Sequence, residues 1–257
     1  MLLDQLVVLY QPVVDLRTGA VVAAEALVRL RDQTTGALLA PARFLPAAER
    51  SGQVTEIDRR VAEIAVGQLG RWRTAHPGRE LTIGVNVSVR DLDDLTLPAR
   101  VAALAARSGV PCEAIIIELT ETLASPEGRG HEAVLEQLVA LGCTVTLDDF
   151  GTGFSSLSHL QRFPVGGIKV DRSFTSRLGE GSRNDRVVRS MVQLGLDLRV
   201  HVTAEGVESV AQLRLLQEMG CPYGQGYLFS RPVPAGELGD LLQRSFPVRL
   251  QQVSAAS

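Results

Sequence analysis

The sequence lacks the usual marks of disulfide-stapled, zinc-binding and nucleic-acid-binding proteins. Its 257 residues include three cysteines, none of them in a CxxC pair, and four histidines without the spacing of metal ligands. The formal net charge of −3 provides no basic footprint for duplex DNA or RNA. We therefore expect the cysteines to be buried free thiols and the histidines to serve in packing or at the surface. No DNA or RNA polymer is expected as a partner.

Membrane and export signals are also missing. No apolar run approaches the roughly 18 residues that cross a bilayer. The N-terminus, Met1-Leu2-Leu3-Asp4, has no basic segment of the kind that starts a signal peptide. An odd number of cysteines without a pairing pattern fits a reducing compartment. These absences predict a cytoplasmic location and no membrane segment in this chain.

What the chain does contain, after about residue 80, is an alternation of short apolar runs with segments of helical periodicity. The runs are rich in Val and Ile and too short for helices, so they predict strands. The alternation predicts a parallel sheet that is buried on both faces. The expected strands span residues 81–87, 114–119, 143–147, 167–170, 200–204 and 226–229, with apolar helix stripes within 134–139, 187–192 and 210–216.

The first part of the chain follows a different pattern. Two strand-like runs, 6–10 and 20–30, are joined by residues 15–19. This link is too short for a helical crossover, so the two strands should be antiparallel. Two helices are expected to follow, near 41–50 and 54–73.

The strand count decides the predicted fold. About eight strands in a chain of this length favour a closed barrel over an open sheet. We therefore predict an α/β fold, a modified TIM-type (β/α)8 barrel with an antiparallel first strand. It should form a single domain over residues 1–250, with a disordered tail at 251–257.

Polar side chains follow the predicted strands at the points where the strands end. Because the carboxyl ends of parallel strands meet at one face of a barrel, these side chains should lie close together at its mouth. Any one acid in such a place is often only a helix cap. The residues concerned are Asn86, Glu118, Asp148, Asp149, Lys169 and Glu205, with Glu25 contributed by an earlier strand.

Five carboxylates in one mouth would repel one another and raise their own pKa values. One or two divalent cations would relieve this repulsion. Oxygen donors with a single amide favour Mg²⁺ or Mn²⁺ over Zn²⁺. The adjacent pair Asp148-Asp149 can let one carboxylate bridge two ions about 3.5–4 Å apart, an arrangement suited to phosphodiester cleavage.

Eight short motifs along the chain form a recognisable set. They are YQPVVD at 10–15, EAL at 25–27, VNVS at 85–88, ELTET at 118–122, DDFGTG at 148–153, IKVD at 168–171, AEGVE at 204–208 and QGY at 225–227. In this combination and order the sequence resembles the EAL family of cyclic-di-GMP phosphodiesterases over about residues 6–235. The resemblance implies a barrel whose first strand opposes the rest, and metal-dependent hydrolysis of cyclic-di-GMP to linear 5′-pGpG.

The resemblance also implies roles for individual residues. Glu205 would act as general base, Lys169 would contact the attacking water, and Asp171 would orient that lysine. Glu121 would anchor the glycine-containing loop after the Asp pair. The implied metal ligands are Glu25, Asn86, Glu118 and Asp148 for one ion and Asp148, Asp149 and Glu205 for the second; the ligand-contacting positions are Gln11, Leu27, Arg29 and Gln225.

The expected cofactors are two Mg²⁺ or Mn²⁺ ions. Ca²⁺ should inhibit, because it is larger, accepts irregular coordination and polarises water less. The resemblance also admits a homodimer, and a sensor or diguanylate-cyclase-like domain in a longer parent protein.

Two other functions are compatible with the residues. One is a non-catalytic cyclic-di-GMP receptor with the same pocket, which binding without turnover in saturating Mg²⁺ would identify. The other follows from the strand-end residues alone: a Mg²⁺ barrel of the enolase type, with Lys169 as the base acting on a carboxylate substrate. A proton-exchange assay on such acids would identify it. The intact set of metal ligands favours the phosphodiesterase.

Overall fold

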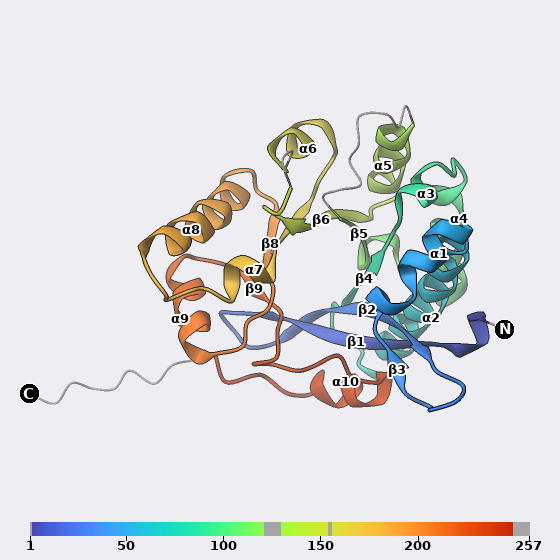
Figure 1. Cartoon of the computed structure of the whole chain (residues 1–257), viewed down its shortest axis with the longest axis horizontal. Coiled ribbons are helices and arrows are strands. Elements are labelled where there is room, and N and C mark those ends of the chain that lie inside the picture. Colours follow the sequence, from blue (N-terminus) through green and yellow to red (C-terminus); the bar gives the residue numbers. More distant parts are fainter. Residues whose placement is uncertain (1, 121–129, 154–155, 249–257) are drawn as a thin grey trace, which may run out of the picture.

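A closed ring of eight strands forms the centre of the protein, with helices around it (Figure 1). The computed structural model describes residues 2–120, 130–153 and 156–248. Around the ring the order is β1-β9-β8-β7-β6-β5-β4-β2, and β1 pairs with β2 to close it. The strands are β1 (Leu6–Asp15), β2 (Val21–Arg31), β4 (Thr82–Asn86), β5 (Ile115–Thr120), β6 (Thr144–Phe150), β7 (Gly167–Val170), β8 (His201–Ala204) and β9 (Tyr223–Gly224), with β3 (Leu38–Leu39) attached outside to β2.

The first strand runs against both of its neighbours. It pairs antiparallel with β2, from Leu6 opposite Leu30 to Val14 opposite Val21, and antiparallel with β9. In the connecting turn, one carboxylate oxygen of Asp15 accepts the backbone N–H groups of Arg17 and Thr18, both at 2.8 Å. From β2 through β9 the ring pairs in parallel. The predicted barrel with an antiparallel first strand is confirmed.

The helices cover the outside of the ring (Figure 1). Helix α2 packs on β1, β2 and β4, α8 packs on β7 and β8, and α10 packs on β1. The expected helix near 41–50 is divided into a short 3₁₀ turn and α1. The helices are α1 (Leu45–Ser51), α2 (Val54–Ala75), α3 (Val89–Leu92), α4 (Leu97–Ser108), α5 (His131–Ala140), α6 (Ser156–Arg162), α7 (Arg172–Thr175), α8 (Ser182–Asp197), α9 (Val210–Glu218) and α10 (Ala235–Leu241), with 3₁₀ turns η1 (Leu2–Gln5), η2 (Pro41–Arg43) and η3 (Cys112–Ala114).

One predicted strand is wrong. The last strand of the ring is the two-residue β9, and residues 226–229 form a turn instead. The backbone of this turn lies against residue 207: the N–H of Leu228 donates to the carbonyl of Val207 at 2.9 Å. The apolar residues at 226–229 resemble a strand in the sequence. The chain bends here because Gly226 lies directly against the Val207 backbone.

Gly226→Ala should therefore destabilise the fold. A Cβ at this position would lie 2.2 Å from the carbonyl oxygen of Val207 and 2.3 Å from its nitrogen. Backbone atoms held by hydrogen bonds cannot move aside cheaply, so we expect a loss of about 1–3 kcal/mol. Urea denaturation would measure it. Gly236→Ala is the control, since nothing lies within 4 Å of the added atom there; equal midpoints for the two variants would contradict the prediction.

Two of the three cysteines have the expected buried position, whereas Cys112 is free but only partly buried. Cys143 and Cys221 are free and buried, and burial raises the pKa of each thiol to about 12. The buried His131 contacts Asp93 at 2.8 Å. In the part of the chain that the structure describes, each helix is too short or too polar to span a bilayer. The predicted tail at 251–257 lies outside the described residues.

Candidate active site

The carboxyl ends of the parallel strands bring the predicted polar residues to one end of the barrel. Glu25 lies within β2, and Asn86 is the last residue of β4. Glu118 and Asp148 lie near the ends of β5 and β6. Lys169 lies in β7, and Glu205 directly follows β8. The list of strand-end residues from the sequence thus becomes a spatial cluster.

Lys169 lies at the centre of this cluster. Its Nζ is 2.8 Å from Glu205 Oε1 and 3.0 Å from Glu25 Oε2. It is 3.2 Å from Asp148 Oδ2 and 3.3 Å from Glu118 Oε2. The lysine side chain is 3% exposed. It is also the single lysine among the 26 basic residues of the chain, so one ammonium group serves four carboxylates.

The charges in the cluster are unbalanced. Burial disfavours the ammonium form, but the nearby carboxylates outweigh this and hold the pKa of Lys169 well above its ordinary value. Burial raises the pKa of Glu118 well above normal, and the pKa of Glu205 rises to about 8 for the same reason. For Glu25, contacts with Lys169 and Gln225 overcome burial and lower the pKa. One cation therefore cannot keep all four acids ionised.

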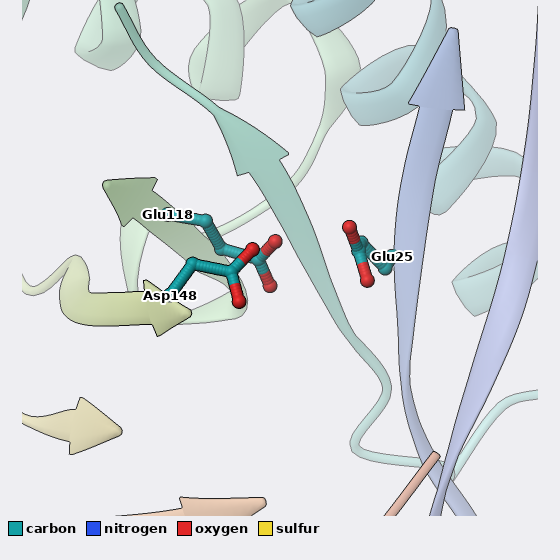
Figure 2. A group of neighbouring side chains, drawn as sticks. All are labelled: Glu25, Glu118 and Asp148. Carbon is teal, nitrogen blue, oxygen red and sulfur yellow. The ribbon is translucent and has the colours of Figure 1, made fainter. Parts of the chain in front are cut away.

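Two overlapping sets of three carboxylates could hold metal ions. Oxygens of Glu25, Glu118 and Asp148 lie within 4.8 Å of one another (Figure 2), and so do oxygens of Asp148, Asp149 and Glu205. Asn86 pairs with Glu118 between β4 and β5, at the edge of the first set. The donors are oxygens in a cluster short of positive charge, and this composition fits hard divalent cations.

A break in strand geometry brings Asp149 into the second set. Successive residues of a strand normally point to opposite faces. Here the β6–β7 register shifts between Leu147 and Phe150, and Asp149 has a left-handed backbone with φ of 54°. The Asp149 N–H donates to Asp148 Oδ1 at 2.9 Å. This local distortion lets two consecutive carboxylates share one site.

A cavity of about 220 Å³ opens beside the cluster, and three of the four predicted ligand-contacting residues line it: Gln11, Leu27 and Gln225. The Gln225 amide donates to Glu25 Oε2 at 2.7 Å and to Gln11 Oε1 at 3.1 Å. Arg29 lies two residues beyond Leu27 on β2, where its guanidinium donates to the carbonyl of Val28 at 2.8 Å. Burial lowers the pKa of Arg29.

Other residues of this cavity were not predicted. Arg172, Glu208 and Tyr227 also line it. Glu208 and Tyr227 fall within the AEGVE and QGY motifs, so the motifs contained a signal that was not assigned. Arg172 follows Asp171 directly, but it lies outside the eight motifs, so nothing in the sequence assigned it to the site. The guanidinium of Arg231 lies over the Tyr227 ring, 4.1 Å from its centroid.

Two predicted roles are not settled by these contacts. Asp171 caps α7, where its carboxylate accepts the N–H of Ser173 at 2.9 Å. Orientation of Lys169 by Asp171 stays a prediction, since four other carboxylates already surround Nζ. Glu121, the predicted loop anchor, lies outside the described residues.

Comparison with known proteins finds one family. The model of the EAL domain matches residues 1–232. A protein of Azorhizobium caulinodans described as uncharacterized is 39% identical over 241 residues, 93% of this chain and 33% of that protein. The bifunctional diguanylate cyclase/cyclic di-GMP phosphodiesterase MucR of Pseudomonas aeruginosa is 36% identical over 234 residues, 91% of this chain and 34% of that protein. The chain thus spans about a third of the length of these relatives.

Solved structures resemble the fold closely. A cyclic-di-GMP complex of the MucR phosphodiesterase superposes with a TM-score of 0.85 at 36% identity, covering 91% of this chain and 94% of that one. The EAL enzyme Bd1971, in a form bound to cAMP and cyclic-di-GMP, gives a TM-score of 0.88 at 29% identity and covers 93% of this chain and 65% of that one.

Proposed function

The chain belongs to the EAL domain family, and we propose that it is a metal-dependent phosphodiesterase that hydrolyses cyclic-di-GMP to linear 5′-pGpG. The observation that carries the proposal is the pair of carboxylate sets that share Asp148 at the mouth of the barrel. The names of similar proteins support the substrate, since MucR and NbdA of Pseudomonas aeruginosa are both described as cyclic di-GMP phosphodiesterases.

In this proposal the carboxylates and one amide hold two Mg²⁺ or Mn²⁺ ions. When bound, the ions supply Lewis-acid polarisation of the scissile phosphate and of the attacking water. The first ion would be held by Glu25, Asn86, Glu118 and Asp148, and the second by Asp148, Asp149 and Glu205.

The chain's own groups then carry the proton and the charge. Glu205 lies in the second carboxylate set and 2.8 Å from Lys169 Nζ, so its carboxylate is placed to accept a proton from the water. The Lys169 ammonium can orient that water and stabilise charge on a phosphoryl oxygen. The water oxygen attacks phosphorus in line, the P–O3′ bond breaks, and the 3′-oxygen takes up a proton. No covalent enzyme intermediate is needed.

Substrate contacts are proposed for the cavity beside the cluster. The cavity of about 220 Å³ is also lined by Glu25, Asp148 and Glu205, so a phosphate bound there would lie beside the proposed metal ligands. In this cavity Gln11 and Gln225 offer amides and Leu27 offers an apolar surface. Arg29, which lies outside the cavity lining and two residues beyond Leu27 on β2, would offer a positive charge for a phosphate. A homodimer and a sensor or diguanylate-cyclase-like domain in a longer parent protein are further proposals.

Hydrolysis should require Mg²⁺ or Mn²⁺ and be suppressed by Ca²⁺. Ca²⁺ accepts irregular coordination and can fill the carboxylate sets without the geometry that Mg²⁺ demands. The protein is incubated with cyclic-di-GMP in each ion or in excess EDTA, and the nucleotides are separated by chromatography. Full activity in Ca²⁺ or in EDTA would contradict the proposed dependence of hydrolysis on Mg²⁺ or Mn²⁺.

The same experiment separates the alternatives. Binding of cyclic-di-GMP without turnover in saturating Mg²⁺ would identify a receptor. The enolase-type reaction needs Lys169 as a neutral base. A proton-exchange assay on carboxylate substrates, in which no exchange is expected, tests this alternative separately.

A further inference from the structure

Gly84 occupies the strand between two of the proposed metal ligands. It lies on β4, where it pairs with Glu25 of the neighbouring strand β2. On the opposite edge of β4, Asn86 pairs with Glu118 of β5. Figure 2 shows β4 passing between Glu25 and Glu118. The Glu118 carboxylate must therefore lie over the inner face of β4 to reach the centre of the cluster.

The space that Glu118 occupies exists because residue 84 has no side chain. A Cβ on Gly84 would lie 2.3 Å from Glu118 Oε1, 2.8 Å from its Cδ and 3.4 Å from its Oε2. The backbone of Gly84 is not left-handed, so conformational freedom gives no reason for glycine here. Glycine is needed at this position only because the Glu118 carboxylate occupies the space that a side chain would fill.

We infer that Gly84 is a positioning residue of the proposed metal centre, which keeps the Glu118 carboxylate within reach of Glu25 and Asp148. The inference rests on the proposed function for the presence of the ions. Glu118 is 4% exposed, and its Oε2 is 3.3 Å from the Lys169 ammonium. A methyl group at residue 84 would push this carboxylate out of the set.

The fold should tolerate that displacement. A cavity of about 670 Å³ inside the barrel is lined by Gly84, Glu118 and Lys169 among others. The far end of a flexible side chain can shift into such a space, whereas a clash with backbone could not be relieved. Gly84→Ala should therefore damage metal binding more than stability.

The test is the affinity of the intact chain for Mn²⁺, measured by calorimetry without nucleotide. We expect Gly84→Ala to weaken Mn²⁺ binding on the order of 10-fold or more, as happens when groups that orient metal ligands are altered. Gly195→Ala is a matched control, because its Cβ would lie equally close, 2.3 Å, to Cγ2 of Val202 between α8 and β8. It should lower the urea midpoint and keep Mn²⁺ affinity within about twofold of wild type.

A second variant tests the named contact. Glu118→Asp shortens the carboxylate, so adding Gly84→Ala in that background should weaken Mn²⁺ binding less than it does in the wild type. If Gly84→Ala alone does not fold, the double variant should restore folding. The inference is overturned if folded Gly84→Ala binds Mn²⁺ within twofold of wild type, or if the effects of the two substitutions are strictly additive. It is also overturned if the double variant does not fold, or if the wild type does not bind Mn²⁺. Wild-type protein that binds Mn²⁺ but leaves cyclic-di-GMP intact would refute only the proposed activity.

Discussion

Glu25→Ala is expected to lower kcat for cyclic-di-GMP hydrolysis by at least about 100-fold, or about 2.7 kcal/mol in the activation barrier. Glu25 is 6% exposed, and its carboxylate meets both Lys169 and Gln225. It belongs to the first set of proposed metal ligands. Its loss also removes one negative charge from a crowded cluster, so the barrel should still fold.

Steady-state kinetics at saturating Mg²⁺, with circular dichroism and urea denaturation alongside, would measure both parts of this prediction. Glu63→Ala serves as the control, because Glu63 is an exposed acid that pairs with Arg60 at 3.4 Å. It should retain wild-type kcat. A folded Glu25→Ala protein with more than about a tenth of the activity would show that the ligand assignment is wrong.

Lys169→Met should have an equally large effect on rate and a second effect on stability. Four carboxylate oxygens lie within 3.3 Å of Nζ. Removing one partner of a buried ionic group typically costs about 3–5 kcal/mol. In excess EDTA we therefore expect a lower free energy of unfolding, and with Mn²⁺ we expect much of it to return, because the cation replaces the missing positive charge.

The stability loss in EDTA should grow with pH. Without Lys169 the pKa values of Glu118 and Glu205, already raised in the folded protein, must rise further. The folded variant then holds protons that the unfolded chain releases at ordinary carboxylate pKa values. Stability is therefore retained near pH 4 and falls as pH rises towards 8. Denaturation at several pH values would measure this; Arg60→Met, which removes an exposed cation, should show no such slope. A Lys169→Met protein with pH-independent stability in EDTA would contradict the charge account.

Most elements of the barrel, and the polar residues that follow its strands, could be predicted from local sequence patterns. A link of five residues was enough to predict the antiparallel β1–β2 hairpin, since no helical crossover fits there. Strand–helix alternation predicted the parallel sheet, because hydrophobic periodicity is a local signal. Glu118, Asp148 and Glu205 could be assigned to one face, because parallel strands place their carboxyl ends together.

Features that depend on the fit between neighbouring strands could not be predicted from the sequence. Nothing local distinguishes the turn at 226–229 from a strand; the difference arises where Gly226 meets the Val207 backbone. The left-handed Asp149 and the shift beside it likewise come from the fit of β6 to β7. The central place of Lys169 among four carboxylates, and the room that Gly84 leaves for Glu118, depend on the stagger and closure of the ring. The closed ring brings together residues as far apart in the sequence as Gln11 and Gln225, 214 positions, and no local pattern predicts such contacts.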